Sequence, residues 1–122
     1  MYLVDENVWN RPAKSKKLTD KGYTPLHWAA RFGHDAIVKV ILNVTGAAMP
    51  RTGTGNTPLH LSAKYGHFNV TKTLLDSIDD DSDINPHAYK GDGDFLTPLH
   101  EAAAGQHPRI VELIMNRHRA SA

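Results

Sequence analysis

Cysteine is absent from the 122-residue sequence. Its absence excludes disulfide bonds, thiolate catalysis and cysteine-based zinc sites, and it fits a reducing compartment. No apolar run approaches the ~20 residues that a membrane-spanning helix needs, and the N-terminal segment lacks the long apolar stretch of a signal peptide. We therefore expect a cytoplasmic or nuclear protein without membrane insertion.

A large charge of either sign is also missing. Lysine and arginine number 14 against 13 aspartates and glutamates, which leaves a net charge of +1. A general nucleic-acid-binding protein carries a large basic excess, so this class is disfavoured. Hydrophobic residues make up 40% and charged residues 22% of the chain, which is typical of a folded protein. The length predicts a single domain over residues 1–122.

One tetrapeptide, Thr-Pro-Leu-His, occurs three times, at residues 24–27, 57–60 and 97–100. The spacings are 33 and 40 residues. Each copy is followed by two small residues, by a histidine ten residues after the threonine, and by a pattern of paired apolar residues. A period of this size indicates an array of small structural units that stack on one another.

Each copy predicts a helix–turn–helix unit. Threonine is a favourable N-cap, proline suits the first helical position, and histidine stands where a capping box has its third-position partner. Gly33 and Gly66 can adopt the left-handed conformation that ends a first helix. We assign a structural capping role to the repeated threonines and histidines: Thr24, His27, Thr57, His60, Thr97 and His100.

The sequence resembles the ankyrin repeat family. The resemblance rests on the three tetrads, the small pairs after them, the Gly-His dipeptides at 33–34 and 66–67 and the 33-residue period. The resemblance implies an all-α helix–turn–helix solenoid with short hairpin-like connectors. It has three full repeats and a partial N-terminal one. We expect a partial repeat or cap at 1–18, repeat 1 at 19–51, repeat 2 at 52–91 with a long acidic connector at 76–96, and repeat 3 with the C-terminal end at 92–122.

The N-terminal segment allows two interpretations. Val4, Val8 and Trp9 fall at the apolar positions of a second helix that would precede repeat 1. Residues 2–10 then form half of an incomplete repeat. An irregular amphipathic cap is the alternative, and either structure would shield the first full repeat.

The third repeat departs from the first two. Its connector is seven residues longer, Phe95 replaces the glycine of Gly22 and Gly55, and Gln106 replaces that of Gly33 and Gly66. We expect a reshaped finger around 85–96 and a different first-helix end near 105–107. The connector's aspartates resemble the start of a calcium loop, but Ile84 and Lys90 stand where its glycine and glutamate should be. We therefore predict a solvated acidic loop and no metal or cofactor; contact with a basic partner is the alternative.

The residue after each tetrad is predicted to lie between repeats. Trp28 and Leu61 are apolar and suit such stacking, whereas Glu101 takes this place in the third copy. For Glu101 we expect either a solvent-facing position at the end of the array or a cation supplied by a further repeat.

No catalytic motif is present, neither a phosphate-binding glycine loop nor a nucleophile elbow nor a zinc-protease motif. A threonine–histidine pair that occurs three times at cap positions favours scaffolding over catalysis. We therefore predict no enzyme activity.

The resemblance implies protein–protein interaction through the concave face and the finger tips of the stack. We expect a monomer that binds another protein, by way of an acidic or aromatic-containing segment, and no nucleic acid. A targeting segment of a larger enzyme, channel or secreted effector is the alternative. The candidate partner-binding residues are Lys21, Tyr23, Arg31, Phe32, Asn56, Lys64, Tyr65 and Leu96.

Overall fold

The computed structural model describes residues 22–45, 50–78, 88–89 and 95–121. In chain order the elements are α1 (Pro25–Arg31), α2 (Asp35–Thr45), α3 (Pro58–Lys64), α4 (Phe68–Ser77), β1 (Ala88–Tyr89), β2 (Phe95–Leu96), α5 (Pro98–Ala104) and α6 (Pro108–Ser121). Repeats 1, 2 and 3 correspond to α1–α2, α3–α4 and α5–α6.

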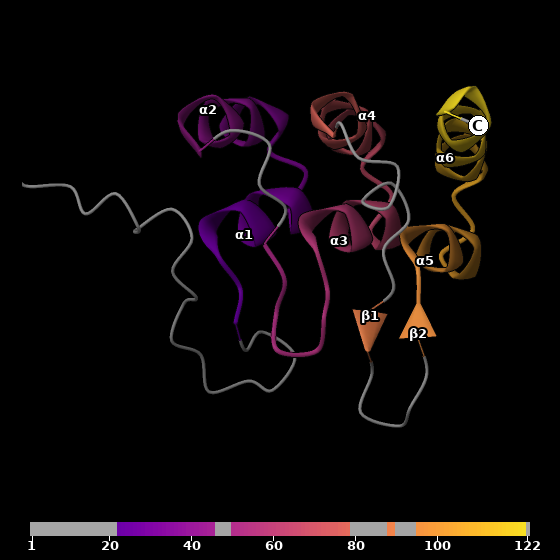
Figure 1. Cartoon of the computed structure of the whole chain (residues 1–122), viewed down its shortest axis with the longest axis horizontal. Helices are drawn as coiled ribbons and strands as arrows, with labels where there is room; N and C mark the ends of the chain where they lie inside the picture. The colour runs from indigo at the N-terminus through magenta and orange to yellow at the C-terminus, as the bar shows by residue number, and fades with distance from the viewer. Residues whose placement is uncertain (1–21, 46–49, 79–87, 90–94, 122) are drawn as a thin grey trace, which may run out of the picture.

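The six helices form two rows (Figure 1). The first helices α1, α3 and α5 lie side by side in one row, and the second helices α2, α4 and α6 lie in the other. Each first helix also packs against the second helix of its own repeat. This is the predicted all-α solenoid. The predicted partial repeat at 1–18 lies outside the described residues.

Every first helix begins with the same hydrogen-bonded cap. In repeat 1 the backbone N–H of Thr24 donates to His27 Nδ1 at 3.0 Å, and the backbone N–H of His27 donates to Thr24 Oγ1. The corresponding threonine N–H to histidine Nδ1 distances are 3.0 Å in repeat 2 and 3.2 Å in repeat 3. The N-cap threonines are extended and a proline follows each of them, as a capping box requires.

The same histidines connect each repeat to the next one. Because Nδ1 accepts a backbone hydrogen bond, the ring proton lies on Nε2. His27 Nε2 donates to the carbonyl oxygen of Asn56 at 2.9 Å, and His60 Nε2 donates to that of Leu96 at 3.1 Å. The cap that starts a helix therefore also fixes the position of the following finger.

A second set of histidines connects each repeat to the preceding one. His67 Nε2 donates to the carbonyl oxygen of Arg31 at 2.8 Å, and His107 Nε2 donates to that of Lys64 at 3.0 Å. These carbonyls lie at the ends of α1 and α3, where the helical backbone leaves acceptors free. Four histidines thus bind the repeats together in both directions along the chain.

The turns between paired helices require a left-handed residue. Gly33 and Gly66 have φ of 74° and 79°. A Cβ at Gly33 would also lie 2.6 Å from the His67 ring, so glycine is needed for space as well as for conformation.

The expected change at the end of the first helix in repeat 3 was wrong. Gln106 adopts φ 60°, the same left-handed conformation as the glycines. The preceding residue, Gly105, has φ −81° and ψ −2°, close to the −93° and 4° of Tyr65. In the described part of the chain no later histidine packs against Gln106, so the turn keeps its geometry and the side chain has room.

The connector of repeat 3 ends in a small antiparallel hairpin. Ala88 pairs with Leu96 and Tyr89 pairs with Phe95. Phe95 is part of a strand, whereas its equivalents Gly22 and Gly55 have φ of 85° and 84°. The reshaped finger predicted around 85–96 is confirmed where the structure describes it; the acidic residues at 79–83, 92 and 94 lie outside that part.

The core lies between the two rows of helices. Each first helix contributes a buried leucine or alanine, and each second helix contributes two or more β-branched or leucine side chains. Its buried members are Leu26, Ala29, Ala30, Val38, Ile41, Leu59, Ala63, Val70, Leu74, Leu75, Ala102, Ile110 and Ile114.

Candidate functional site

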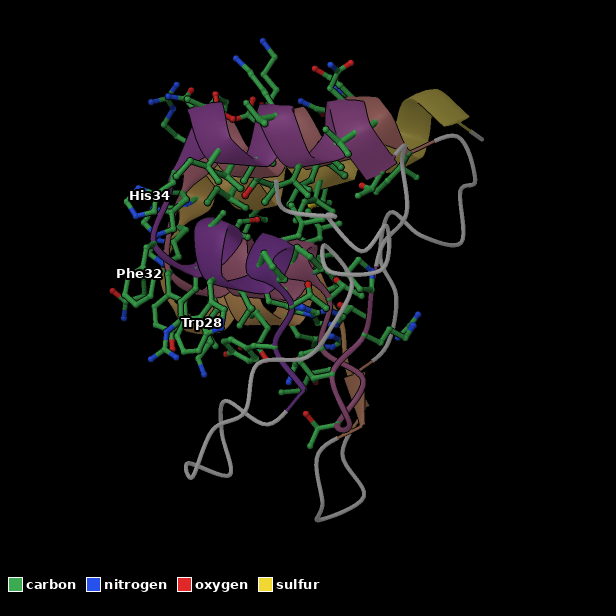
Figure 2. All side chains as sticks on the ribbon, turned by 90° about the vertical axis from the view of Figure 1, so that its left-hand side faces the viewer. Trp28, Phe32 and His34 are labelled. Atoms are coloured by element: carbon green, nitrogen blue, oxygen red, sulfur yellow. The ribbon has the colours of Figure 1, made fainter. Side chains whose placement is uncertain are left out.

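The ends of α1 and α3 carry a group of aromatic and basic side chains. We call Trp28, Arg31, Phe32, Lys64 and Tyr65 the Arg31 surface. Three of its members come from repeat 1 and two from repeat 2, and the packing of α1 against α3 brings them together. Figure 2 shows Trp28 and Phe32 projecting from the same edge of the stack as His34.

Arg31 is the centre of this surface. Its Cζ lies 5.4 Å from the ring centroid of Phe32 and 5.7 Å from that of Trp28 in its own repeat. It also lies 5.4 Å from the ring of Tyr65 in the next repeat. A guanidinium within about 6 Å of an aromatic face is attracted by the ring quadrupole. These contacts connect the aromatic residues of two repeats through one cation.

Phe32 and Tyr65 present their rings to solvent. Phe32 is 56% exposed and Tyr65 is 41% exposed, so they do not fill gaps between helices. Lys64 is exposed as well, and its Nζ lies 5.5 Å from the Tyr65 ring. In repeat 3 the equivalent positions are Ala104 and Gly105. The Arg31 surface therefore ends at repeat 2.

Tyr23 lies inside the protein, contrary to the expectation of a partner-contacting residue. It is only 4% exposed. Its ring stacks on His27 with a centroid distance of 5.4 Å and meets the edge of Trp28 at 4.9 Å. Arg31 Cζ also lies 5.9 Å from the Tyr23 ring. Tyr23 therefore supports the Arg31 surface from below.

Two other predicted residues belong to the connectors. Asn56 and Leu96 are half-buried, and their carbonyls accept the hydrogen bonds of His27 and His60. Their main-chain role is structural and separate from the Arg31 surface. The remaining candidate, Lys21, lies outside the described residues.

Trp28 was assigned to stacking between repeats, but the structure makes it part of the surface. Its ring lies parallel to that of Phe32, with an interplanar angle of 3° and a centroid distance of 6.1 Å. Leu61, at the same position in repeat 2, is buried. Trp28 is half-buried because this position faces the preceding repeat. The signal available in the sequence was that Trp28 follows the first of the three tetrads, so the position belongs to the first full repeat.

Glu101 was expected either to face solvent or to meet a cation from a further repeat, and the structure places it differently. Its side chain is buried rather than solvent-facing, because α5 packs against α3 on this side. The position thus faces repeat 2 and not a later repeat.

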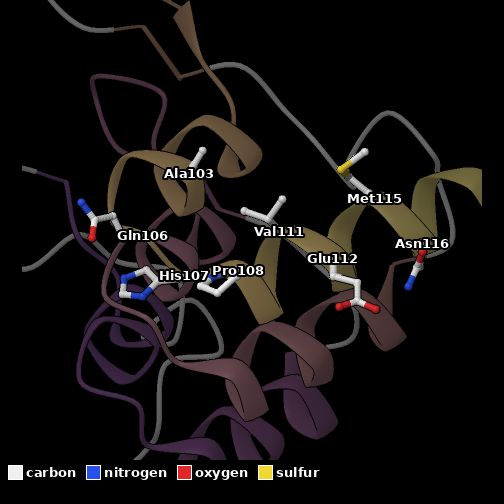
Figure 3. Close-up of a pocket in the computed structure, with 8 residues that line it drawn as sticks. All are labelled: Ala103, Gln106, His107, Pro108, Val111, Glu112, Met115 and Asn116. Atoms are coloured by element: carbon white, nitrogen blue, oxygen red, sulfur yellow. The ribbon is translucent and has the colours of Figure 1, made fainter.

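Two apolar grooves lie at the two ends of the stack. At the N-terminal end, Trp28, Phe32, Ile37 and Val40 line a groove of about 700 Å³. At the other end, α5, the following turn and α6 surround a groove of about 750 Å³ (Figure 3). Its lining includes the apolar side chains of Val111 and Met115 and the polar side chains of Gln106, Glu112 and Asn116. The second groove is thus the more polar of the two.

The buried ring of His27 is held by structural hydrogen bonds to Thr24 and to the carbonyl oxygen of Asn56. Burial lowers the pKa of His27 from 6.5 to about 4, although its hydrogen bond to the Asn56 carbonyl acts in the opposite direction. The ring is therefore neutral at physiological pH.

Within the described ranges no three histidine or acidic side chains are grouped as a metal site would require. No helix in this part of the chain is long and apolar enough to cross a bilayer.

The protein is a stack of helical repeats with an exposed aromatic and basic surface. The family model of ankyrin repeats in three copies matches residues 1–88 and 46–121. The chain belongs to the ankyrin repeat family. No curated protein matches the sequence. Ankyrin repeats are generally protein–protein interaction modules and are typically non-catalytic.

Proposed function

We propose that the chain is a non-catalytic module that binds a partner protein through the Arg31 surface. The observation that carries this proposal is the shared guanidinium of Arg31, which connects exposed aromatic rings of two adjacent repeats. Such a surface is preassembled, so a partner meets rings that are already ordered. Tyrosine, tryptophan and arginine are also the residues that contribute most to binding energy at interfaces.

The charge of the surface suggests the chemistry of the partner. Arg31 and Lys64 are cationic, and none of its five residues carries a carboxylate. An acidic residue of the partner would approach Arg31 or Lys64, while an aromatic or aliphatic residue would pack on Phe32 and Tyr65. We therefore propose that the partner presents a segment that combines acidic and aromatic residues. The chain acts on it by binding alone, in the cytoplasm or nucleus.

Selection from a library of displayed random peptides tests this proposal. We expect the selected peptides to be rich in Asp, Glu, Phe, Tyr and Trp, and to bind the purified protein less tightly when their acidic residues are replaced by lysine. The double variant Phe32→Ala/Tyr65→Ala should weaken binding by about 2 kcal/mol or more. Both side chains are exposed, so folding should be retained.

Met115→Ala is the matched control. Met115 is exposed and apolar but lies on α6, at the other end of the stack. Its variant should bind the selected peptides as the unchanged protein does. Peptides that lose affinity with Met115→Ala and keep it with Phe32→Ala/Tyr65→Ala would place the binding site elsewhere and refute the proposal.

A further inference from the structure

The outer face of α2 carries aliphatic side chains that no described segment covers. Ile37, Val40 and Val44 are 50%, 59% and 57% exposed. Together with Ile41, the first two line the α2 side of the groove at the N-terminal end of the stack. Water-exposed aliphatic side chains grouped on one helix face indicate a surface that another element covers.

The later repeats show what covers these positions. Val70, which is equivalent to Ile37, is 1% exposed because α2 packs against α4. Thr73, which is equivalent to Val40, donates a hydrogen bond to Asp35 of α2 at 2.6 Å. In repeat 3, Arg117 stands at the position of Val44 and pairs with Asp76 of α4. In each case the cover is the second helix of the preceding repeat.

The sequence places a matching segment 33 residues before α2. Tyr2 stands at the position of Asp35 and Phe68, which both contact the next repeat. Val8 stands at the position of Ile41 and Leu74, which are buried. Residues 11–23 would connect this segment to Thr24, as residues 44–56 connect α2 to Thr57. The two connecting segments have the same length.

Two further positions agree with this placement. Trp9 is equivalent to Leu75, which is 1% exposed beneath repeat 3, and to Met115, which is exposed at the end of the stack. This position therefore faces the following repeat. Asp5 is equivalent to Thr71, whose hydroxyl bonds Ser62 in the first helix of its own repeat. Asp5 would thus point toward the first helix of its own repeat and away from α2.

We propose that residues 2–10 form a helix that packs on α2 as the second helix of the repeat before repeat 1. Tyr2 and Trp9 face Ile37, Val40 and Val44, and Val8 joins the core. The segment belongs to the same chain, and the ankyrin family model matches the sequence from residue 1. It covers the α2 side of the groove and leaves the Trp28 and Phe32 side to the Arg31 surface. This inference does not depend on the proposed function.

Tryptophan fluorescence tests the packing of Trp9. The chain has two tryptophans, Trp9 and Trp28, so Trp28→Phe leaves Trp9 as the only reporter. We expect its emission to be blue-shifted in the folded protein relative to the urea-unfolded protein, and to shift back to longer wavelength when Val40→Asp is added. The matched control Met115→Asp places the same charge at the far end and should change nothing. The proposal is overturned if the emission wavelength of Trp9 equals that of the unfolded protein, or if Val40→Asp does not change it.

Two further measurements separate the alternatives. Asn7→Pro in the Trp28→Phe background should expose Trp9, because proline breaks a helix interior, whereas Asn7→Ala should not. Equal emission from both variants would favour an irregular cap and overturn the helix. The blue shift should be unchanged on dilution; a blue shift lost on dilution would mean that Trp9 packs on a second copy and overturn packing within one chain. Circular dichroism checks that every variant retains a folded, helical spectrum.

Discussion

The middle and third repeats contain the same Thr-Pro-Leu-His tetrad in different surroundings. In α3 every residue from Pro58 to Ala63 is buried, including both Leu59 and His60. In α5 the equivalent Leu99 is half-buried and His100 is exposed. The capping box is nevertheless complete in both helices. The local hydrogen bonds thus follow from the tetrad, whereas its burial depends on whether a further repeat lies beside it.

The difference in burial between the two tetrads reflects how a repeat array is stabilised. Each unit has an internal contribution and a contribution from each neighbour. Repeat 2 is in contact with repeats 1 and 3 on its two sides, whereas the described part of the chain gives repeat 3 contacts on one side only. Equivalent substitutions should therefore lower the free energy of unfolding more in repeat 2 than in repeat 3.

The largest difference is expected at the leucine of the tetrad. Leu59→Ala removes a fully buried side chain and should lower the free energy of unfolding by about 4 kcal/mol, whereas Leu99→Ala should lower it by about 2 kcal/mol. Urea unfolding followed by circular dichroism measures both values. Equal losses would show that the repeats are not distinguished by their neighbours.

The pH dependence of stability should be nearly as large, because His27 lies beneath repeat 2. Its pKa is about 4 when folded, against 6.5 for an ordinary histidine. The unfolded state binds a proton first as pH falls, so stability is present above pH 6.5 and is lost progressively down to pH 4. The loss amounts to about 3 kcal/mol. In urea unfolding across this range His27→Gln should flatten the curve; an unchanged slope would assign the pH dependence to other groups.

Substitutions at the histidine of the tetrad should cause smaller losses of stability than those at the leucine. His60→Ala removes the cap and also the hydrogen bond to the carbonyl of Leu96, whereas His100→Ala removes an exposed cap. We expect losses of about 3 and about 1 kcal/mol respectively in thermal or urea unfolding. A cost at His100 as large as that at His60 would mean that the cap alone determines the effect.

The smallest effect is expected at the helix turns, and its sign should reverse between repeats. Gln106→Gly relieves a left-handed residue and should stabilise the protein by about 1 kcal/mol. Gly66→Ala should destabilise it, because the new Cβ would lie 2.6 Å from the His107 ring. Melting temperatures of the two variants measure the contrast. A destabilised Gln106→Gly would show that the Gln106 side chain makes a stabilising contact.

The sequence predicted features that depend on short spacing. The threonine–histidine caps, the glycine turns at 33 and 66 and the stacking of helix pairs all follow from residues a few positions apart, repeated with a constant period. The finger around 85–96 was predicted because its connector is longer and lacks the glycine of the other two. These features are local, so the tetrad and its surroundings suffice to specify them.

The burial of individual side chains was harder to predict. The sequence predicted that Tyr23 contacts a partner and that Glu101 either faces solvent or meets a cation from a further repeat, whereas both side chains are buried. Whether Trp28 fills a contact between repeats or joins a surface depends on what precedes repeat 1, and not on the residues beside it. Gln106 adopts the left-handed conformation of the equivalent glycines because the packing of α5 against α6 fixes the turn between them.

The repeated tetrad was sufficient to predict the family, the helix pairs and their order in the stack, because capping and turn formation involve residues within one short segment. The side chains that form the Arg31 surface are brought together by the packing of the repeats. Arg31 and Tyr65 lie in different repeats, and their approach depends on how α1 packs against α3. The contact between Arg31 and Tyr65 joins residues more than 30 positions apart, so it follows from the packed stack rather than from any one repeat.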